Sequence, residues 1–182
     1  MDAKHVLRKE LRNQAKLHTL DDFMQEDKLS CDALLQSHAY KTADRVFAFM
    51  PLDSEVNIKE ILEHCIADKH LALPVCNEDT SLSFYEVKHL DALSLGRHGI
   101  LAPETTQVAV PTEKDILIVP ALAYTRTGDR LGRGKGYYDR YLSTYPTILS
   151  IGMCRTYQLL QSIPTEAWDI RVSKVLCAGV FY

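Results

Sequence analysis

The chain has 182 residues, which is enough for one ordinary domain and too short for two. Hydrophobic residues make up 46% and charged residues 25%, close to the globular average, and these values exclude a disordered or fibrous protein. With 21 basic and 24 acidic residues the net charge is −3, so we expect no general attraction to nucleic acid or to an anionic membrane.

Cysteine and apolar patterns favour a soluble cytoplasmic protein. The five cysteines are odd in number and contain no CxxC pair, so neither a disulfide framework nor a zinc site is expected. The N-terminal stretch MDAKHVLRKELRNQAK is charged throughout, and no apolar run approaches the roughly 18 residues of a membrane span. We therefore expect small buried thiols in a reducing compartment.

The N-terminal part, residues 1–40, is predicted to be helical. In the first helix apolar side chains recur every four positions, and neither glycine nor proline interrupts them. A second helix is predicted over residues 21–35. The positions expected to point inward are Ala3, Leu7, Leu11 and Ala15 in the first helix, and Phe23, Met24, Cys31, Leu34 and Leu35 in the second.

Apolar, β-prone runs alternate with helical stretches along the rest of the chain. Residues 45–50 form the first run, which Pro51 ends. Asn57 then opens a helix with an Asn-x-x-Glu capping signature that Glu60 completes. Further strands are predicted over residues 71–76, 82–87, 116–123, 147–153 and 175–182, and further helices over residues 137–143 and 157–162.

The order of these elements predicts one α/β domain over residues 1–182. The strands are apolar at consecutive positions, so both of their faces are expected to be covered, and this favours a mostly parallel central sheet flanked by helices. Residues 71–76 and 82–87 could form a hairpin or an antiparallel edge. Residues 91–112 are the least regular part and are expected to form a surface excursion.

Four of the eight glycines fall in one short basic loop, GDRLGRGKGYYD, residues 128–139. Glycine leaves backbone N–H groups unobstructed and permits positive φ, so alternating glycines can surround an anion with donors. Arg130, Arg133 and Lys135 add positive charge. The helix predicted from residue 137 would direct its N-terminal dipole to the same place.

The spacing of this loop is neither that of a Walker A loop nor that of a dinucleotide-binding fingerprint. A mobile surface turn is the alternative interpretation of the same composition. The loop follows the strand predicted over residues 116–123, where open α/β sheets keep their ligand crevice, and this position favours phosphate binding.

Basic side chains also form a stripe on the first helix. Lys4, Arg8 and Arg12 are four residues apart and line one helical face. A solvated face is the usual explanation for such a stripe. Alternatively, Lys4 and Arg8 reach a polyphosphate held by the glycine loop, and nothing local decides between the two.

Taken together, these motifs resemble the 5-formyltetrahydrofolate cyclo-ligase family, also called 5,10-methenyltetrahydrofolate synthetases. The glycine loop LGRGKGYYDRYL is the specific motif. The resemblance covers essentially the whole chain, because KxxxR at Lys4 and Arg8, FMPLDSEV, LPV, IVPALAY and WDIRV occur in the family's order. It implies one α/β domain similar to ribose-phosphate isomerases and CoA transferases.

The resemblance implies an enzyme that couples ATP hydrolysis to ring closure. The formyl oxygen of 5-formyltetrahydrofolate would attack the γ-phosphate of ATP and give a phosphorylated imidate. The 10-nitrogen would then add to the activated carbon, and phosphate would leave to give 5,10-methenyltetrahydrofolate. Such a reaction needs positioning, cations and a metal more than covalent chemistry from the protein. The implied partners are the two small-molecule substrates and Mg²⁺, with no nucleic acid and no membrane, and we expect a monomer.

Residue roles follow from the resemblance position by position. ATP is expected at Lys4, Arg8 and the loop residues Arg130, Leu131, Gly132, Arg133, Gly134, Lys135, Gly136, Tyr137 and Tyr138. The folate is expected at Met50, Glu55, Arg133, Gly134, Lys135, Gly136 and Tyr137. Asp139 and Asp169 are expected to hold Mg²⁺, which prefers oxygen ligands. Arg133, Lys135 and Tyr137 are expected to act in catalysis.

These assignments have structural alternatives. Met50 could be a core residue at the end of a strand, and Glu55 could be an exposed residue before a helix cap. Asp169 could be a turn residue, and Asp139 could pair with Arg140 or Lys135 on a solvated helix face.

Four positions depart from the family's pattern, namely Ala102, Ala121, Thr125 and Ser173. Thr125 and Ser173 leave open how well the metal site is supported. They also keep a non-catalytic nucleotide or phosphate sensor as the alternative function. A sugar-phosphate isomerase or CoA transferase is a second alternative, although no motif supplies the catalytic carboxylate that it would need.

Overall fold

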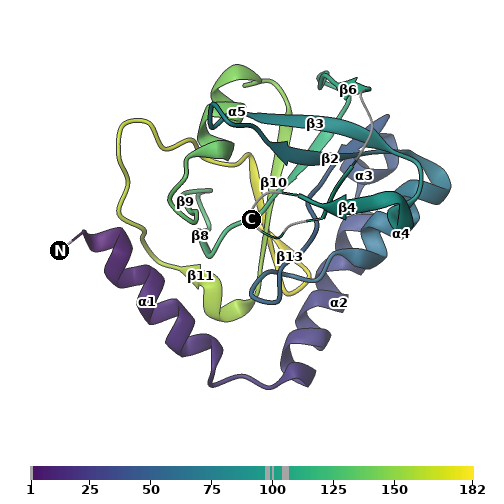
Figure 1. Ribbon diagram of the computed structural model, residues 1–182. Helices are drawn as coiled ribbons and strands as arrows, with labels where there is room; N and C mark the ends of the chain where they lie inside the picture. The colour runs from purple at the N-terminus through teal and green to yellow at the C-terminus, as the bar shows by residue number, and fades with distance from the viewer. Residues whose placement is uncertain (1, 97–98, 100, 104–106) are drawn as a thin grey trace.

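A mixed eight-stranded sheet forms the centre of the computed structural model, which describes residues 2–96, 99, 101–103 and 107–182 (Figure 1). From edge to edge the strands are β13 (Val180–Phe181), β12 (Lys174–Cys177), β10 (Leu149–Cys154), β7 (Ile116–Val119), β1 (Arg45–Phe47), β2 (His70–Cys76), β3 (Leu82–Val87) and β6 (Val108–Ala109). The five successive strands β12, β10, β7, β1 and β2 run parallel, and the pairs β13–β12, β2–β3 and β3–β6 are antiparallel. The predicted α/β domain with a mostly parallel sheet is therefore confirmed.

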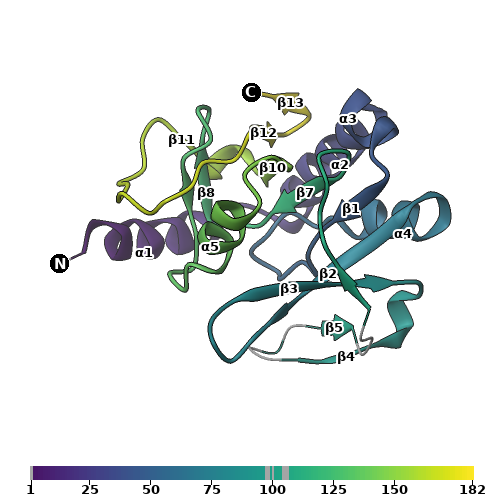
Figure 2. The same ribbon diagram turned by 90° about the horizontal axis from the view of Figure 1, so that it is seen from above.

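Helices cover both faces of this sheet. Successive residues of a strand point to opposite faces, so Val46 packs with α2 (Leu20–Gln36), α3 (His38–Thr42) and α4 (Lys59–Asp68), whereas Phe47 packs with α5 (Tyr137–Thr144). Figure 2 shows α2 and α3 together on one side, away from α5. This two-sided burial is the reason for the consecutive apolar residues in the sequence.

A second, three-stranded sheet supports the N-terminal helix. It has the order β11 (Leu159–Leu160), β8 (Ala123–Thr125) and β9 (Arg130–Leu131). Helix α1 (Ala3–Ala15) packs on it through Leu11, which shares an apolar cluster with Leu131. This contact places the basic stripe of α1 beside the glycine loop, which includes β9.

The segment predicted to be least regular, residues 91–112, contains short elements. The 3₁₀ turn η1 (Leu90–Ala92) is followed by the hairpin of β4 (Leu93–Leu95) and β5 (Leu101–Pro103), and then by β6. Residues 97–98, 100 and 104–106 of this segment lie outside the described part of the chain. Of the two arrangements considered for residues 71–76 and 82–87, the hairpin is confirmed by β2 and β3, whereas the edge position beyond β3 is taken by β6.

Some predicted strands were too long. The prediction over residues 116–123 was wrong beyond Val119, because Pro120 cannot donate to the ladder and the chain crosses to β8 in the other sheet. The run over residues 175–182 turns back on itself at Ala178 and Gly179, where φ is 45° and 85°. The run over residues 45–50 leaves the strand after Phe47, although its following residues remain apolar.

Three helical predictions were also wrong in detail. Residues 157–162 form the 3₁₀ turn η3 (Thr156–Gln158) and then β11, which pairs with β8. Helix α4 begins at Lys59, whose N–H donates to the Asn57 side chain at 3.2 Å, and Glu60 binds Lys28 instead of closing a capping box. Met24 is 68% exposed, because the N-terminal end of α2 extends past the sheet (Figure 1).

Among the helices of the described residues, none combines the length and apolar character that a bilayer crossing requires.

Candidate active site

A cavity of about 710 Å³ lies where the chain leaves the middle of the sheet in opposite directions, from β1 toward β2 and from β7 toward β10. Ligand crevices of open α/β sheets form beyond the carboxyl ends of the strands at such a point. Phe49 and Met50 follow β1 there, and Pro120 and Ala121 follow β7. The parallel topology therefore positions this cavity.

Every residue assigned to a site from the sequence lines this one cavity. Contributions come from α1, the connection after β1, the glycine loop and the segment before β12. The roles of these residues stay predictions, but their convergence is a property of the fold. The assigned residues along the cavity are Lys4, Arg8, Met50, Glu55, Arg130, Leu131, Gly132, Arg133, Gly134, Lys135, Gly136, Tyr137, Tyr138, Asp139 and Asp169.

The glycine loop wraps the mouth of the cavity and enters α5. Gly134 and Gly136 have φ of +98° and +67°, values that L side chains rarely adopt. A Cβ on Gly136 would also lie 2.8 Å from Nη1 of Arg140. Arg140 itself donates to the carbonyls of Lys135 and Thr80, at 2.8 and 2.5 Å, so it ties the loop to the turn that carries Thr80. The loop is held in place rather than left as a free surface turn.

Lys4 is a buried cation of the cavity and not part of a solvated face. Only 9% of the residue is exposed, and its Nζ lies 2.7 Å from Glu166 Oε2 and 2.6 Å from Asp169 Oδ2. Burial alone would lower the pKa of Lys4, but hydrogen bonds to Asp169 and Glu166 outweigh it and raise the pKa. The ammonium group therefore stays charged beside two carboxylates.

The other two basic residues of the α1 stripe differ from each other. Arg8 points to the glycine loop and donates from Nε to the Gly132 carbonyl at 2.9 Å. Arg12 is exposed and donates to the Arg8 carbonyl within its own helix. The stripe is thus divided into two residues at the cavity and one at the surface.

Asp139 is the acceptor of a buried arginine. Its Oδ1 lies 2.6 Å from Nη2 of Arg130 and also accepts the Ile170 N–H at 3.1 Å. Arg130 is 8% exposed and lies over the Tyr138 ring at 5.9 Å. The alternative in which Asp139 pairs with Arg140 was wrong, because Arg140 turns to Thr80.

Asp139 and Asp169 could hold Mg²⁺ only together with a bound ligand that supplies further oxygen atoms. Among the described residues no group of three or more His, Cys, Asp or Glu side chains is placed to hold a metal ion. Each aspartate uses one oxygen for its cation, Oδ1 in Asp139 and Oδ2 in Asp169. Mg²⁺ commonly takes one or two carboxylates and completes its shell with water and substrate phosphates. Two aspartates fit that requirement.

Glu55 and Arg133 form an ion pair in the lining of the cavity. Glu55 is 6% exposed, so the alternative of an exposed residue before a helix cap was wrong. Its Oε1 accepts from Nε and Nη2 of Arg133 at 3.2 and 3.0 Å, and its Oε2 accepts the Leu52 N–H at 3.0 Å. Met50 was expected either in the core or at the folate site, and it both packs on the core and lines the cavity.

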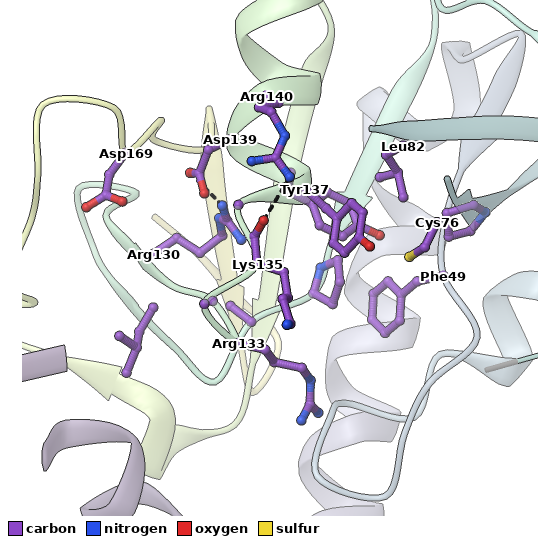
Figure 3. A pocket seen from close by; sticks show the side chains of 18 of the residues that line it. Phe49, Cys76, Leu82, Arg130, Arg133, Lys135, Tyr137, Asp139, Arg140 and Asp169 are labelled. Atoms are coloured by element: carbon purple, nitrogen blue, oxygen red, sulfur yellow. Dashed lines mark hydrogen bonds and ion pairs between the residues drawn. The ribbon is translucent and has the colours of Figure 1, made fainter. Parts of the chain in front are cut away.

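The two ends differ in chemistry (Figure 3). Arg130, Asp139 and Asp169 lie together at one end, and Phe49, Cys76 and Leu82 lie at the other. Lys135 and Tyr137 stand between the two groups, with Arg133 beside them. The cavity can therefore hold a charged ligand and a flat, partly apolar one next to each other.

Several cavity residues carry no role in the sequence interpretation. Glu166 shares Lys4 with Asp169, and the 67% exposed Trp168 lies at the rim. Trp168 belongs to the WDIRV motif and could have been found there, whereas no spacing marks Glu166. Thr125 and Ser173 are outside the cavity lining. The Thr125 hydroxyl binds Asp129 at 3.0 Å, and the Ser173 hydroxyl binds that of Ser150 at 3.1 Å.

We expect Cys76, which lines the cavity and is half-buried, to be the first cysteine to react with a small thiol reagent at neutral pH. Burial raises the pKa of Cys31 to about 12 and of Cys65 to about 11, so both are protonated. A thiol hydrogen bond raises the pKa of Cys154 and lowers that of Cys177, but Cys177 is only 5% exposed. Mass mapping of labelled peptides checks the order.

The Cys76→Ser variant provides the control for this labelling. It should lose the fast phase and leave the slow phase of the other thiols unchanged. A fast phase that persists in Cys76→Ser would contradict the accessibility that the structure assigns to this cysteine.

Fold and site together define an α/β enzyme with a cation-lined cavity at the switch point of its sheet. The family model of 5-formyltetrahydrofolate cyclo-ligases matches residues 1–178. The 5-formyltetrahydrofolate cyclo-ligase of Haemophilus influenzae is 27% identical over 181 residues, covering 95% of this chain and 96% of the relative. That of Escherichia coli is 30% identical over 141 residues, covering 74% of this chain and 78% of the relative.

A solved structure agrees with these sequence relatives. The NMR structure of the 5,10-methenyltetrahydrofolate synthetase of Aquifex aeolicus is similar with a TM-score of 0.87 and 26% identity, covering 99% of this chain and 92% of that one. The chain belongs to the 5-formyltetrahydrofolate cyclo-ligase family, and it is an enzyme of the ligase class.

Proposed function

We propose that the chain converts 5-formyltetrahydrofolate to 5,10-methenyltetrahydrofolate, using ATP with Mg²⁺ and releasing ADP and phosphate. One observation carries the proposal: Lys135 and Tyr137 of the glycine loop stand between the charged end of the cavity, with Arg130, Asp139 and Asp169, and its apolar end, with Phe49, Cys76 and Leu82 (Figure 3). A triphosphate at the first end and a folate at the second would present their reacting atoms to Lys135 and Tyr137.

The reaction proceeds in two substitutions. The formyl oxygen attacks the γ-phosphorus, the bond to ADP breaks, and a phosphorylated imidate forms. The 10-nitrogen then adds to the activated carbon and loses its proton, and phosphate leaves with the former formyl oxygen. Phosphoryl transfer of this kind gains most from positioned cations, which Arg133 and Lys135 supply, while Tyr137 orients the reacting groups.

The ends of the cavity have separate tasks. Lys4, Arg8, Arg130 and the backbone of residues 131–138 bind the phosphates. Glu55 accepts N–H bonds from the aminopyrimidinone, and Met50 supplies apolar contact. Asp139 and Asp169 hold Mg²⁺, which neutralises phosphate charge when it is bound.

Further properties belong to the same proposal. The partners are the two small substrates, and the chain works as a cytoplasmic monomer. Its fold resembles that of ribose-phosphate isomerases and CoA transferases. The alternative function is a nucleotide or phosphate sensor without turnover; Thr125 and Ser173, the two residues that suggest it, lie outside the cavity lining.

The proposal is tested with purified protein, Mg-ATP and 5-formyltetrahydrofolate, by following the absorbance of the methenyl product. We expect one ADP and one phosphate for each product molecule. ATP binding without any methenyl product, under every metal condition tried, would favour the sensor instead.

Arg8→Ala should weaken ATP binding by about 1.5–3 kcal/mol, the value of a charge-assisted contact. The side chain lies at the cavity and gives the loop one hydrogen bond, to the Gly132 carbonyl, so the fold should lose little stability. Calorimetric titration with ATP measures the change. Arg12→Ala is the matched control one helical turn away. Equal ATP affinities of the two variants would mean that Arg8, like Arg12, does not contact ATP.

A further inference from the structure

The segment that carries Glu55 has no regular secondary structure. It connects β1 to α4, and the backbone bond from the Glu55 N–H to the Leu52 carbonyl, 2.8 Å long, closes only a local turn. A carboxylate on such a segment cannot be placed accurately by its own turn. Contacts from other elements must fix it.

A buried ion pair lies directly behind this segment. Arg155, at the end of β10, is 3% exposed, and Asp27 of α2 is 6% exposed. The pair is bidentate, with Nε to Oδ1 and Nη2 to Oδ2 both at 2.8 Å. The guanidinium also lies 4.0 Å from the centre of the Phe23 ring, so its plane is held from a second direction.

Both members of the pair bind the backbone around Glu55. Nη2 of Arg155 donates to the Glu55 carbonyl at 2.7 Å, and Oδ2 of Asp27 accepts the Asn57 N–H at 2.9 Å. The backbone is thus fixed on either side of the Glu55 side chain. The carboxylate of Glu55 points the other way, into the cavity.

Gln158 forms a second brace on the same segment. Its Nε2 donates to the Leu122 carbonyl at 3.1 Å and to the Ser54 carbonyl at 3.5 Å, and its Oε1 accepts the Arg155 N–H at 2.9 Å. Since Leu122 follows the cavity residue Ala121, the brace connects the Glu55 segment to the chain leaving β7.

A buried ion pair is weak evidence for stability, because desolvation of the two charges offsets their attraction. Its hydrogen bonds to one loop point to a different use. We propose that Asp27 and Arg155 are positioning residues that hold Glu55 in place for the folate, and this rests on the proposed function of the cavity. Neither α2, which carries Asp27, nor β10, which Arg155 follows, contributes a residue to the cavity lining. The pair therefore acts on the ligand only through Glu55.

The first experiment separates folate binding from ATP binding. Arg155→Lys keeps the charge but loses the bidentate geometry, and it should raise the dissociation constant of 5-formyltetrahydrofolate about tenfold. The dissociation constant of ATP should change less than about twofold, since the phosphate end does not depend on this pair. Calorimetry measures both constants without requiring turnover.

Two further variants control for folding. Asp27→Leu combined with Arg155→Met replaces the pair by apolar side chains, which commonly preserves stability, and it should show the same loss of folate affinity. Arg45→Lys alters an arginine that binds Glu86 and the Val110 carbonyl at the opposite end of β1, and it should leave folate affinity unchanged. Unchanged folate affinity in the folded apolar pair would overturn the proposal.

A double-mutant cycle with Glu55→Gln shows whether the pair acts through Glu55. If it does, Arg155→Lys added to Glu55→Gln should weaken folate binding no further, because the positioned group is already lost. Fully additive losses would refute positioning and leave the proposed function intact. A wild-type protein that binds no folate would refute the proposed function first, and this assignment with it.

Discussion

Asp139→Asn should reduce the rate of methenyl product formation by about a hundredfold or more at low Mg²⁺, while ATP binding changes little. The asparagine oxygen can still accept from Arg130 and from the Ile170 N–H, so both bonds that the carboxylate makes to the protein can persist. What disappears is the negative charge that offsets Mg²⁺. Partial recovery at raised Mg²⁺ or with Mn²⁺ would identify the lost interaction as one with the metal.

Asp129→Asn is the matched control for this variant. Asp129 lies outside the cavity lining and binds Arg171 at 2.7 Å, and hydrogen bonds from Arg171 and from the neighbouring threonines lower its pKa against the effect of burial. Its substitution should cost some stability and keep turnover. Near-normal activity of Asp139→Asn at low Mg²⁺ would limit Asp139 to the ordering of Arg130.

The sequence could predict which residues meet but not how they are paired. Gly134, Gly136 and Lys135 are recognisable because their types are required locally, by positive φ and by the charge of a phosphate. The parallel sheet was predictable from consecutive apolar residues, and its switch point then defines the cavity. These inferences need only local pattern and topology.

Partners that are distant in the chain leave no local signal. Lys4 binds Asp169 across 165 positions, and Asp27 binds Arg155 across 128, and neither pair has a spacing that predicts the other member. The predicted ends of the strands were wrong for a similar reason. Pro120 marks the end of β7, but only the three-dimensional structure shows that Ala123 continues in another sheet.

Glu55→Gln should weaken the binding of 5-formyltetrahydrofolate about ten- to a hundredfold, which corresponds to the loss of charge-assisted hydrogen bonds in a buried place. Both carboxylate oxygens of Glu55 face donors, Arg133 on one side and the Leu52 N–H on the other. An amide has one acceptor oxygen, so its NH₂ group must face one of these donors or the pterin. ATP affinity should change less than folate affinity, because Glu55 reaches the phosphate-binding residues only through its bond to Arg133.

Glu60→Gln provides the same chemical change at a surface position, where Glu60 binds Lys28 at 3.1 Å, and it should leave folate affinity unaltered. Arg133→Met tests whether the effect of Glu55→Gln comes only from releasing Arg133. If Glu55 binds the pterin itself, Arg133→Met should lower turnover through the loss of a cation and should cost less folate affinity than Glu55→Gln does. Equal losses of folate affinity in Arg133→Met and Glu55→Gln would instead make Glu55 an anchor for the arginine.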